Sequence, residues 1–269
     1  MQKAMADAGV ASRRDCELAI RAGRVRVNGR RVTSLPCLVE PGDLIELDGA
    51  VIDTRRRSAI RERQRLYLML NKPRGVISTA SDPEGRPNVV ALVAPAVPQG
   101  DRVYPVGRLD ADSTGLVLLT NDGELAHRLA HPRHGVAKEY RVTVQGRLSP
   151  EILARLSRGL YLADPDDPAR PARRARPDRL RLLEQKKDRS RGDLSLVSII
   201  LREGQNREIR RLFARVGAKV RRLERVALGP LQLRGLASGQ YRRLRTAEIE
   251  ALKQSVDLHE PAAPSQRGR

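Results

Sequence analysis

The sequence predicts an α+β protein made of a small N-terminal module and a larger domain. The length of 269 residues allows one large and one small domain, and a hydrophobic content of 40% is enough for packed cores. A charged run, 54–65, separates two stretches that each carry helix and strand patterns. We therefore expect a module at 1–53, a basic linker at 54–65 and a domain at 66–255.

The N-terminal module is expected to begin with a helix and a hairpin. Ser12 suits the N-cap of the helix, Asp15 lies three residues later as its capping partner, and Gly23 ends it. Residues 25–27 alternate valine with arginine as a strand does, and Asn28-Gly29 is typical of a type I′ turn. Val32 and the run 44–47 supply the remaining strands.

Arginines gather on this helix and hairpin, with few acidic residues beside them. They are Arg13, Arg14, Arg21, Arg24, Arg26, Arg30 and Arg31. A solvated surface is the simpler interpretation. The local excess favours a face that contacts phosphates.

The larger domain is expected to open with a strand at 66–70 that stops at the turn 71–75. Asn121 is placed to cap a helix, with Glu124 at its third position, that ends at Pro132. Further strands are expected at 140–144 and 196–201.

A second helix follows these strands. Ile209, Leu212, Phe213 and Val216 have the spacing of an amphipathic helix. The arginines on its other face suit a polyanion better than plain solvent. They are Arg207, Arg210 and Arg211.

Two stretches are expected to lack regular structure. Residues 164–191 begin with a run rich in Pro, Asp and Arg and continue strongly basic, which indicates a mobile basic insertion. Residues 256–269 are expected to form a disordered tail.

The formal net charge of +20 indicates a nucleic-acid partner. No long basic amphipathic helix suits a membrane surface, and an aromatic content of 2% disfavours modules that stack bases on rows of rings. No apolar run is long enough to span a membrane, and no secretion signal is visible. Cys16 and Cys37 lack a disulfide or redox spacing, so we expect a cytoplasmic protein.

Cofactor motifs are absent from the sequence. Neither a phosphate-binding G-x-x-x-x-G-K-[ST] loop nor a G-x-G-x-x-G turn after a strand occurs. His127 and His131 lie one helical turn apart with His134 nearby, which would suit zinc. Pro132 interrupts that helix and no Cys or carboxylate completes the set, so we expect no metal.

The stretch 105–123 holds the candidate catalytic group. Asp110 follows Arg108 by two residues at an expected strand-to-loop junction, so the guanidinium would stabilise the ionised carboxylate. Such an aspartate can act as nucleophile, base or ligand, although an isolated Arg-x-Asp is more often a surface ion pair. Asp112 would allow a carboxylate pair, but 112–115 is typical of a turn.

Two resemblances extend these observations. Residues 8–14, 22–25 and 27–29 resemble the S-four type RNA-binding fold. The larger domain resembles the RsuA/RluB group of bacterial pseudouridine synthases in three ordered blocks. These blocks are 67–79; 105–140, with Gly107-Arg108-Leu109-Asp110 and Lys138-Glu139-Tyr140; and 203–231, with Glu203 to Phe213 and Leu223-Glu224-Arg225-Val226. The pair of domains looks most like the RluB branch, which acts on large-subunit ribosomal RNA.

The resemblance implies a two-part, mixed and mostly antiparallel sheet with a central cleft and no cofactor. It implies that Asp110 is the nucleophile, that Tyr140 packs against the target base, and that Arg210 pairs with Asp110. Glu208 replaces a common Gln, and Ser113 a common Thr. The residues expected to bind RNA are Arg13, Arg14, Arg24, Arg26, Lys72, Arg108, Arg207 and Arg211.

The expected function is therefore conversion of one uridine in ribosomal RNA to pseudouridine. The uridine is expected to flip out of the RNA, and the protein to act as a monomer on ribosomal RNA or an assembly intermediate. The alternatives are a non-catalytic RNA-binding or ribosome-assembly protein and an RNA methyltransferase. The first would bind RNA without isomerising uridine, and the second would need S-adenosylmethionine.

Overall fold

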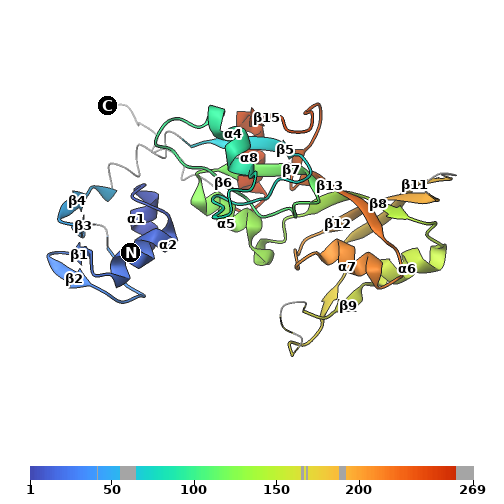
Figure 1. The fold of residues 1–269 in the computed structure, drawn as a ribbon, viewed down its shortest axis with the longest axis horizontal. Helices are drawn as coiled ribbons and strands as arrows, with labels where there is room; N and C mark the ends of the chain where they lie inside the picture. Colours follow the sequence, from blue (N-terminus) through green and yellow to red (C-terminus); the bar gives the residue numbers. More distant parts are fainter. Residues whose placement is uncertain (41, 55–64, 165–166, 168, 188–191, 259–269) are drawn as a thin grey trace, which may run out of the picture. The chain divides into compact units, whose positions relative to one another are not determined.

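The computed structural model describes all residues except 41, 55–64, 165–166, 168, 188–191 and 259–269 (Figure 1). The chain divides into two compact units. The first holds residues 1–66 and the second holds most of the remainder. The linker expected at 54–65 lies almost entirely outside the described residues.

The first unit consists of two helices and a four-stranded antiparallel sheet that share one core. The elements are α1 (Gln2–Asp7), α2 (Arg13–Arg21), β1 (Val25–Val27), β2 (Arg30–Val32), β3 (Ile45–Leu47) and β4 (Ala50–Ile52), with strand order β2-β1-β3-β4. The core contains Met5, Cys16, Ala19, Ile20, Val25 and Ile45. Ser12 Oγ accepts a hydrogen bond from the Asp15 N–H at 3.1 Å, which confirms the predicted cap. Asn28 and Gly29 have φ values of 50° and 78°, as a type I′ turn requires.

The second unit is built on a nine-stranded sheet. Its strands are β5 (Tyr67–Lys72), β6 (Tyr104–Pro105), β7 (Thr114–Thr120), β8 (Lys138–Gln145), β11 (Arg179–Lys186), β12 (Leu194–Leu201), β13 (Val220–Leu228), β14 (Leu231–Gln232) and β15 (Tyr241–Arg243). The order is β11-β12-β8-β13-β7-β5-β15, with β14 beside β13 and β6 beside β7. Every pair is antiparallel except β13 and β7, which confirms the mixed, mostly antiparallel sheet.

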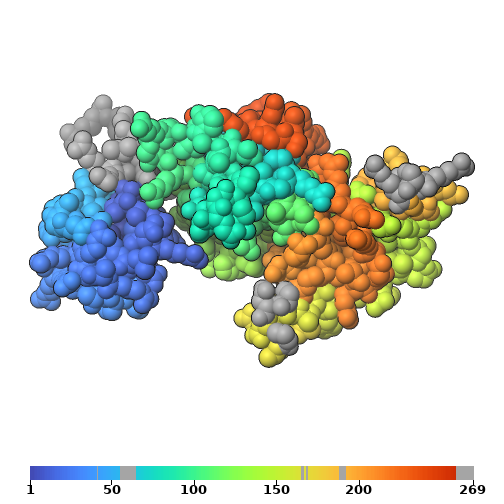
Figure 2. Space-filling model, in the orientation of Figure 1, coloured from blue at the N-terminus to red at the C-terminus, as the bar shows by residue number. Residues whose placement is uncertain are grey.

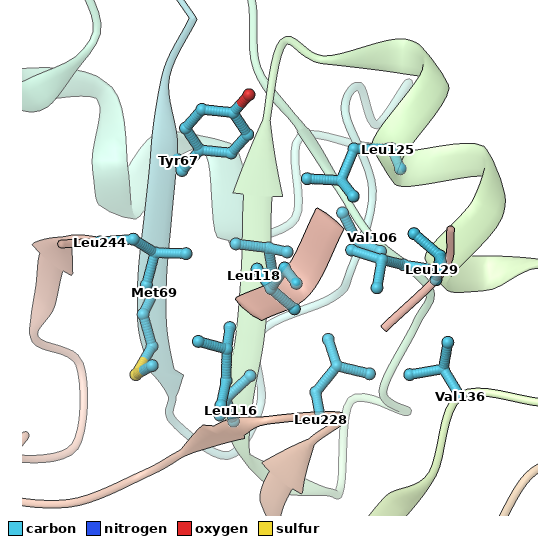
Figure 3. Packing of buried hydrophobic residues seen from close by; sticks show 14 residues of the cluster. Tyr67, Met69, Val106, Leu116, Leu118, Leu125, Leu129, Val136, Leu228 and Leu244 are labelled. Atoms are coloured by element: carbon cyan, nitrogen blue, oxygen red, sulfur yellow. The ribbon is translucent and has the colours of Figure 1, made fainter. Parts of the chain in front are cut away.

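Two hydrophobic cores divide this unit into two parts. The remaining elements are α4 (Val89–Val93), α5 (Gly123–Ala130), α6 (Pro150–Arg158), β9 (Leu160–Leu162), β10 (Arg173–Ala175), α7 (Glu208–Ala214) and α8 (Thr246–Gln254), with short 3₁₀ turns at Ala94–Ala96 and Pro132–His134. One core joins β5 and β7 to α5 and α8, as the cluster of Met69, Leu118 and Leu125 shows (Figure 3). The other joins β8, β12 and β13 to α6 and α7.

The structure corrects the predicted mobile insertion at 164–191. Residues 173–175 form β10, which pairs with β9, and 179–186 form the edge strand β11. Leu180 and Leu182 point from β11 toward the second core, while Arg179 and Arg181 are exposed. The basic composition therefore belongs to the outer face of an ordered strand. The β9 segment lies beside α7 at the surface (Figure 2).

Two smaller predictions were wrong by a few residues. The cap of α5 is Asp122, whose Oδ1 accepts from the Leu125 N–H at 3.1 Å, and not Asn121. Asp122 is buried, and its Oδ2 also accepts from the Tyr67 hydroxyl at 2.8 Å, so tertiary contact decides between two suitable caps. The tail predicted from 256 starts too early, because Val256 is buried in the first core; 259–269 lie outside the described residues.

Gly115 is where the two parts of the sheet meet. It has a φ of 104° and lies opposite Arg225 in the parallel pairing of β7 with β13. A Cβ at this position would lie 2.7 Å from the Arg225 nitrogen and closer still to its carbonyl oxygen. Only glycine allows the two backbones to approach this closely.

Gly115→Ala is therefore expected to lower the free energy of unfolding by more than about 2 kcal/mol, through backbone overlap added to the strain of a positive φ. Gly146→Ala is the matched control, because Gly146 has a φ of 87° and no described residue lies within 4 Å of a methyl group added there. It should cost about 1 kcal/mol. Urea denaturation measures both. Equal losses would show that the β7–β13 contact is not the constraint.

Candidate active site

Asp110 lies in the loop 106–113 between β6 and β7, and not at the end of a strand as expected. Leu109 is buried, and its N–H donates to Ser78 Oγ at 3.1 Å. The Ser78 hydroxyl donates back to the Leu109 carbonyl oxygen at 3.0 Å. The Ser113 N–H donates to the Asp110 carbonyl oxygen at 3.0 Å, which closes a turn at 110–113. The turn predicted at 112–115 was placed two residues too late, because Thr114 and Gly115 belong to β7. The residues on both sides of Asp110 are thus fixed by buried contacts.

Lys72 supports this loop from below. Its side chain is completely buried, and Nζ donates to the carbonyl oxygens of Val76 at 2.6 Å and Pro73 at 3.0 Å. A longer bond of 3.5 Å reaches the Ala111 carbonyl oxygen, next to Asp110. The prediction that Lys72 binds RNA was therefore wrong, because its ammonium group is enclosed by protein. It joins the turn after β5 to the Asp110 loop.

Two arginines of the 207–211 region face the aspartates, in an arrangement that differs from the expected one. Arg207 Nη1 lies 3.4 Å from Asp110 Oδ2, and Arg207 Nη2 lies 3.6 Å from Asp112 Oδ2. Arg210 Nη2 lies 3.0 Å from Asp112 Oδ2 and not beside Asp110. Arg210 was expected to pair with Asp110. In the structure Arg207 pairs with Asp110, and Arg210 pairs with Asp112 in the same turn.

Helix α7 fixes both arginines because its other face is buried. Ile209, Leu212 and Phe213 enter the second core, as the helical spacing predicted. Arg207 precedes the helix with φ 48° and ψ 34°, a left-handed conformation that is unfavourable for a residue with a side chain. This backbone turn directs the Arg207 guanidinium toward Asp110.

A cavity of about 330 Å³ opens beside Asp110. This volume is within the range of pockets that take small ligands. The loop after β6 and the end of α5 form one side of its wall, and strands β8, β12 and β13 form the other, which confirms the expected cleft. The lining includes Asp110, Lys138, Tyr140, Arg207, Leu223 and Arg225. Asp112 is not among the lining residues, so Asp110 is the carboxylate of this loop that faces the cavity.

Tyr140 lies on β8 directly opposite Arg225 of β13 and Ile199 of β12. It is half-buried and packs against the second core. Tyr140 also lines the cavity, and its contact to a planar base stays a prediction. Arg108 is exposed at the rim of the same cavity.

Sequence reasoning did not identify five further charged residues that line the cavity. Arg202 and Glu203 are exposed, and the other three are at least partly buried. Lys138 Nζ donates to the carbonyl oxygens of Arg202 at 3.2 Å and Val136 at 3.4 Å. Burial, and then the charge of Arg225, lower the pKa of Lys138. Glu208 Oε2 accepts from the Gln205 N–H at 2.9 Å, and burial raises the pKa of Glu208. Arg225 is almost completely buried.

The other predicted RNA-binding residues divide into two groups. Those of the first unit are exposed: Arg13, Arg14, Arg24 and Arg26. Arg24 forms an ion pair with Asp48, which reduces its net charge. Arg211 differs from the prediction, because it donates to the carbonyl oxygens of Asn206 at 3.0 Å and of Ala163. It holds the segment after β9 against α7.

The three histidines lie at the end of α5, with the rings of His127 and His131 5.3 Å apart. Across the described parts of the chain, no group of three His, Cys, Asp or Glu side chains is placed to hold a metal ion. No helix among the described residues is long and apolar enough to cross a membrane.

The buried ammonium group of Lys72 predicts a measurable pH dependence of stability. Burial lowers the pKa of Lys72 to about 8, although Asp110 and Asp112 act in the opposite direction. The unfolded chain keeps this proton to a pH of about 10.4, so it binds more protons than the folded chain between these values. The free energy of unfolding of the natural protein, relative to Lys72→Met, should therefore rise by up to about 3 kcal/mol from pH 7.5 to 10.5.

Urea denaturation of both proteins across this pH range measures the difference. Taking the difference removes the titration of groups that behave alike in both. A difference that stays constant with pH would show that the ammonium group titrates as in water.

Comparisons with known proteins show the family to which the chain belongs. Residues 66–215 match the family described as RNA pseudouridylate synthase, and residues 2–45 match the S4 domain. The chain is 39% identical to ribosomal large subunit pseudouridine synthase B of Bacillus subtilis, over 96% of each chain. It is 40% identical to the enzyme of the same name from Pseudomonas aeruginosa, over 98% of this chain and 64% of that one.

A solved structure titled as a pseudouridylate synthase covers 93% of this chain and 98% of its own. It has a TM-score of 0.58 and 29% sequence identity. The match extends over both units, so the sequence resemblance and the fold class are both confirmed. The residues around Asp110 fall within the matched family segment. This chain carries an N-terminal S4 domain and belongs to the RNA pseudouridine synthases, a family of isomerases.

Proposed function

We propose that this protein converts a specific uridine of large-subunit ribosomal RNA to pseudouridine, with Asp110 as the nucleophile. The names of the most similar relatives support the choice of RNA. The observation that carries the assignment to Asp110 is its position on the cavity wall, 3.4 Å from the guanidinium of Arg207.

The reaction exchanges one bond of the uracil ring for another. The bond from C1′ of ribose to N1 breaks, and a bond from C1′ to C5 forms. The C5 proton leaves and N1 gains a proton, so the composition is unchanged. A carboxylate can hold the ribose or the ring covalently while the base turns. Asp110 suits either role, because its side chain is 35% exposed and the residue lines the cavity.

Asp112 is the less suitable nucleophile. Arg210 and Arg207 both hold its Oδ2, at 3.0 and 3.6 Å. Its Oδ1 is buried and has no hydrogen-bond partner among the described residues. A carboxylate that is held by two guanidinium groups is stabilised as an anion and less free to attack. We assign Asp112 the role of fixing α7 against the Asp110 loop.

The cavity requires the uridine to leave the RNA stack. Unstacking costs a few kcal/mol, which contacts to the flipped base and to the RNA backbone must offset. Tyr140 and Leu223 offer flat and apolar contact to the base. Arg108 is exposed at the rim, where it can contact a flanking phosphate.

The exposed arginines of the first unit are proposed to bind the RNA backbone. Arg13, Arg14 and Arg26 have no acidic partner among the described residues. Each phosphate contact of this kind makes affinity more sensitive to salt. The proposed setting is the cytoplasm, where ribosomal RNA or its assembly intermediates are the substrate.

Asp110→Asn is expected to abolish pseudouridine formation and to leave RNA affinity unchanged. The amide keeps the shape of the side chain but is not a nucleophile, so the rate should fall at least about 10,000-fold. Tritium release from RNA labelled at C5 of uridine measures turnover, and filter binding measures affinity over a salt series. Turnover by the variant would remove Asp110 from this role. RNA binding without turnover by the natural protein would favour a non-catalytic function.

Arg207 is expected to lower the stability of the fold through its left-handed backbone and to support activity through its guanidinium. Arg207→Gly removes both the guanidinium beside Asp110 and the strain of the left-handed backbone, whereas Arg207→Ala removes the guanidinium alone. Both variants should lose turnover to a similar extent. The glycine variant should be more stable than the alanine variant by about 1 kcal/mol. Equal stability of the two would show that this backbone conformation carries no strain.

A further inference from the structure

Arg225 is a buried cation at the wall of the catalytic cavity. It lies on β13 between Tyr140 of β8 and Gly115 of β7. Its side chain is 1% exposed. The close approach of β7 at Gly115 brings the Leu116 carbonyl oxygen within 2.7 Å of Arg225 Nε, which donates to it. The fold therefore fixes the direction of this side chain.

The hydrogen-bonding groups of Arg225 are not all satisfied by the protein. Nη2 is buried and has no hydrogen-bond partner in the described part of the chain. No carboxylate among those residues forms an ion pair with Arg225. An unpaired buried guanidinium costs several kcal/mol, so a fold that keeps one holds it for an acceptor that binds there.

The surroundings of Arg225 indicate the kind of acceptor. Leu223, Leu228 and Tyr140 make the adjacent wall mostly apolar. Lys138 adds a second cation, and Arg225 lowers the pKa of that lysine, so the two charges are close enough to interact. An apolar wall with buried donors suits a flat heterocycle that has carbonyl oxygens. Uracil has two such oxygens, at C2 and C4.

The reaction places negative charge on this heterocycle. When the C1′–N1 bond breaks, its electron pair stays with the ring and spreads onto the two carbonyl oxygens. It is used again when C5 bonds to C1′, and the ring then loses the C5 proton and gains one at N1. A donor that is fixed before the reaction stabilises such charge without reorganising, and loss of one such donor slows reactions about 100- to 1,000-fold.

We infer that Arg225 is a catalytic residue that donates from its free guanidinium nitrogen to a carbonyl oxygen of the flipped uracil and stabilises the anion of the detached ring. This inference rests on the proposed function of the same cavity. Arg225 acts on the leaving base, whereas Arg207 acts on Asp110.

The first test measures single-turnover rates for Arg225→Met and Arg225→Ala on a ribosomal RNA fragment that the natural protein modifies. We expect both rates to fall about 100- to 1,000-fold while the RNA dissociation constant is unchanged. Guanidinium chloride at millimolar concentration should restore part of the rate of the alanine variant and leave its Tm unchanged. Arg222→Ala is the control, because Arg222 is exposed on the same strand; its rate should equal that of the natural protein.

The second test does not depend on the folding of a variant. RNA with 2-thiouridine or 4-thiouridine at the target position replaces one carbonyl oxygen with sulfur, a poorer acceptor. One of the two should slow the natural protein, and in Arg225→Met that thio effect should largely disappear. Full rate with both thio substrates, or an Arg225→Met rate equal to the natural one, would overturn the inference and leave the proposed function intact. Absence of turnover by the natural protein would overturn both.

Discussion

The parallel pairing of β7 with β13 is the constraint on which the site depends. It joins two parts that have separate cores, and it is possible because Gly115 lacks a side chain where Arg225 passes. The Asp110 loop leads directly into β7, while α7 leads into β13. Asp110 and Asp112 therefore come from one part of the sheet, and the arginines that face them come from the other. A small shift of one part would separate them, since they meet at distances of 3.0 to 3.6 Å.

The charges around Asp110 also act across this junction. Arg207 and Arg210 approach the loop from α7, and Lys72 is buried against the same loop, where burial opposes its charge. Two aspartates in one turn would repel each other without these cations. The loop thus depends on α7, and α7 depends on the second core through Ile209 and Phe213. Folding of both parts is required before the carboxylate has its final surroundings.

The sequence predicted most of the elements, because their signals are local. Ser12, Asn28-Gly29 and the spacing of Ile209 to Phe213 all act within a few residues. The errors have a tertiary origin. The basic composition of 179–186 concealed the alternation of Leu180 and Leu182, which becomes meaningful only when β12 lies alongside. Lys72 and Arg211 look like surface cations until the carbonyl oxygens that they bind are brought to them by the fold.

Local sequence patterns also failed to predict which arginine lies beside Asp110. Arg207 and Arg210 are one helical turn apart, so by spacing alone either arginine could pair with Asp110. The same is true of Asp112, two residues later. The left-handed backbone of Arg207 decides which one faces Asp110, and no periodicity in the sequence reports a backbone of that kind. Likewise, Arg225 lies two residues after buried Leu223 on β13, at an inward-facing position where an apolar residue is usual. Its burial follows from neighbours on both sides of β13, one of them a glycine distant in sequence. Long-range backbone approach, more than local pattern, therefore determines which cations lie beside Asp110 and the cavity and which support the fold.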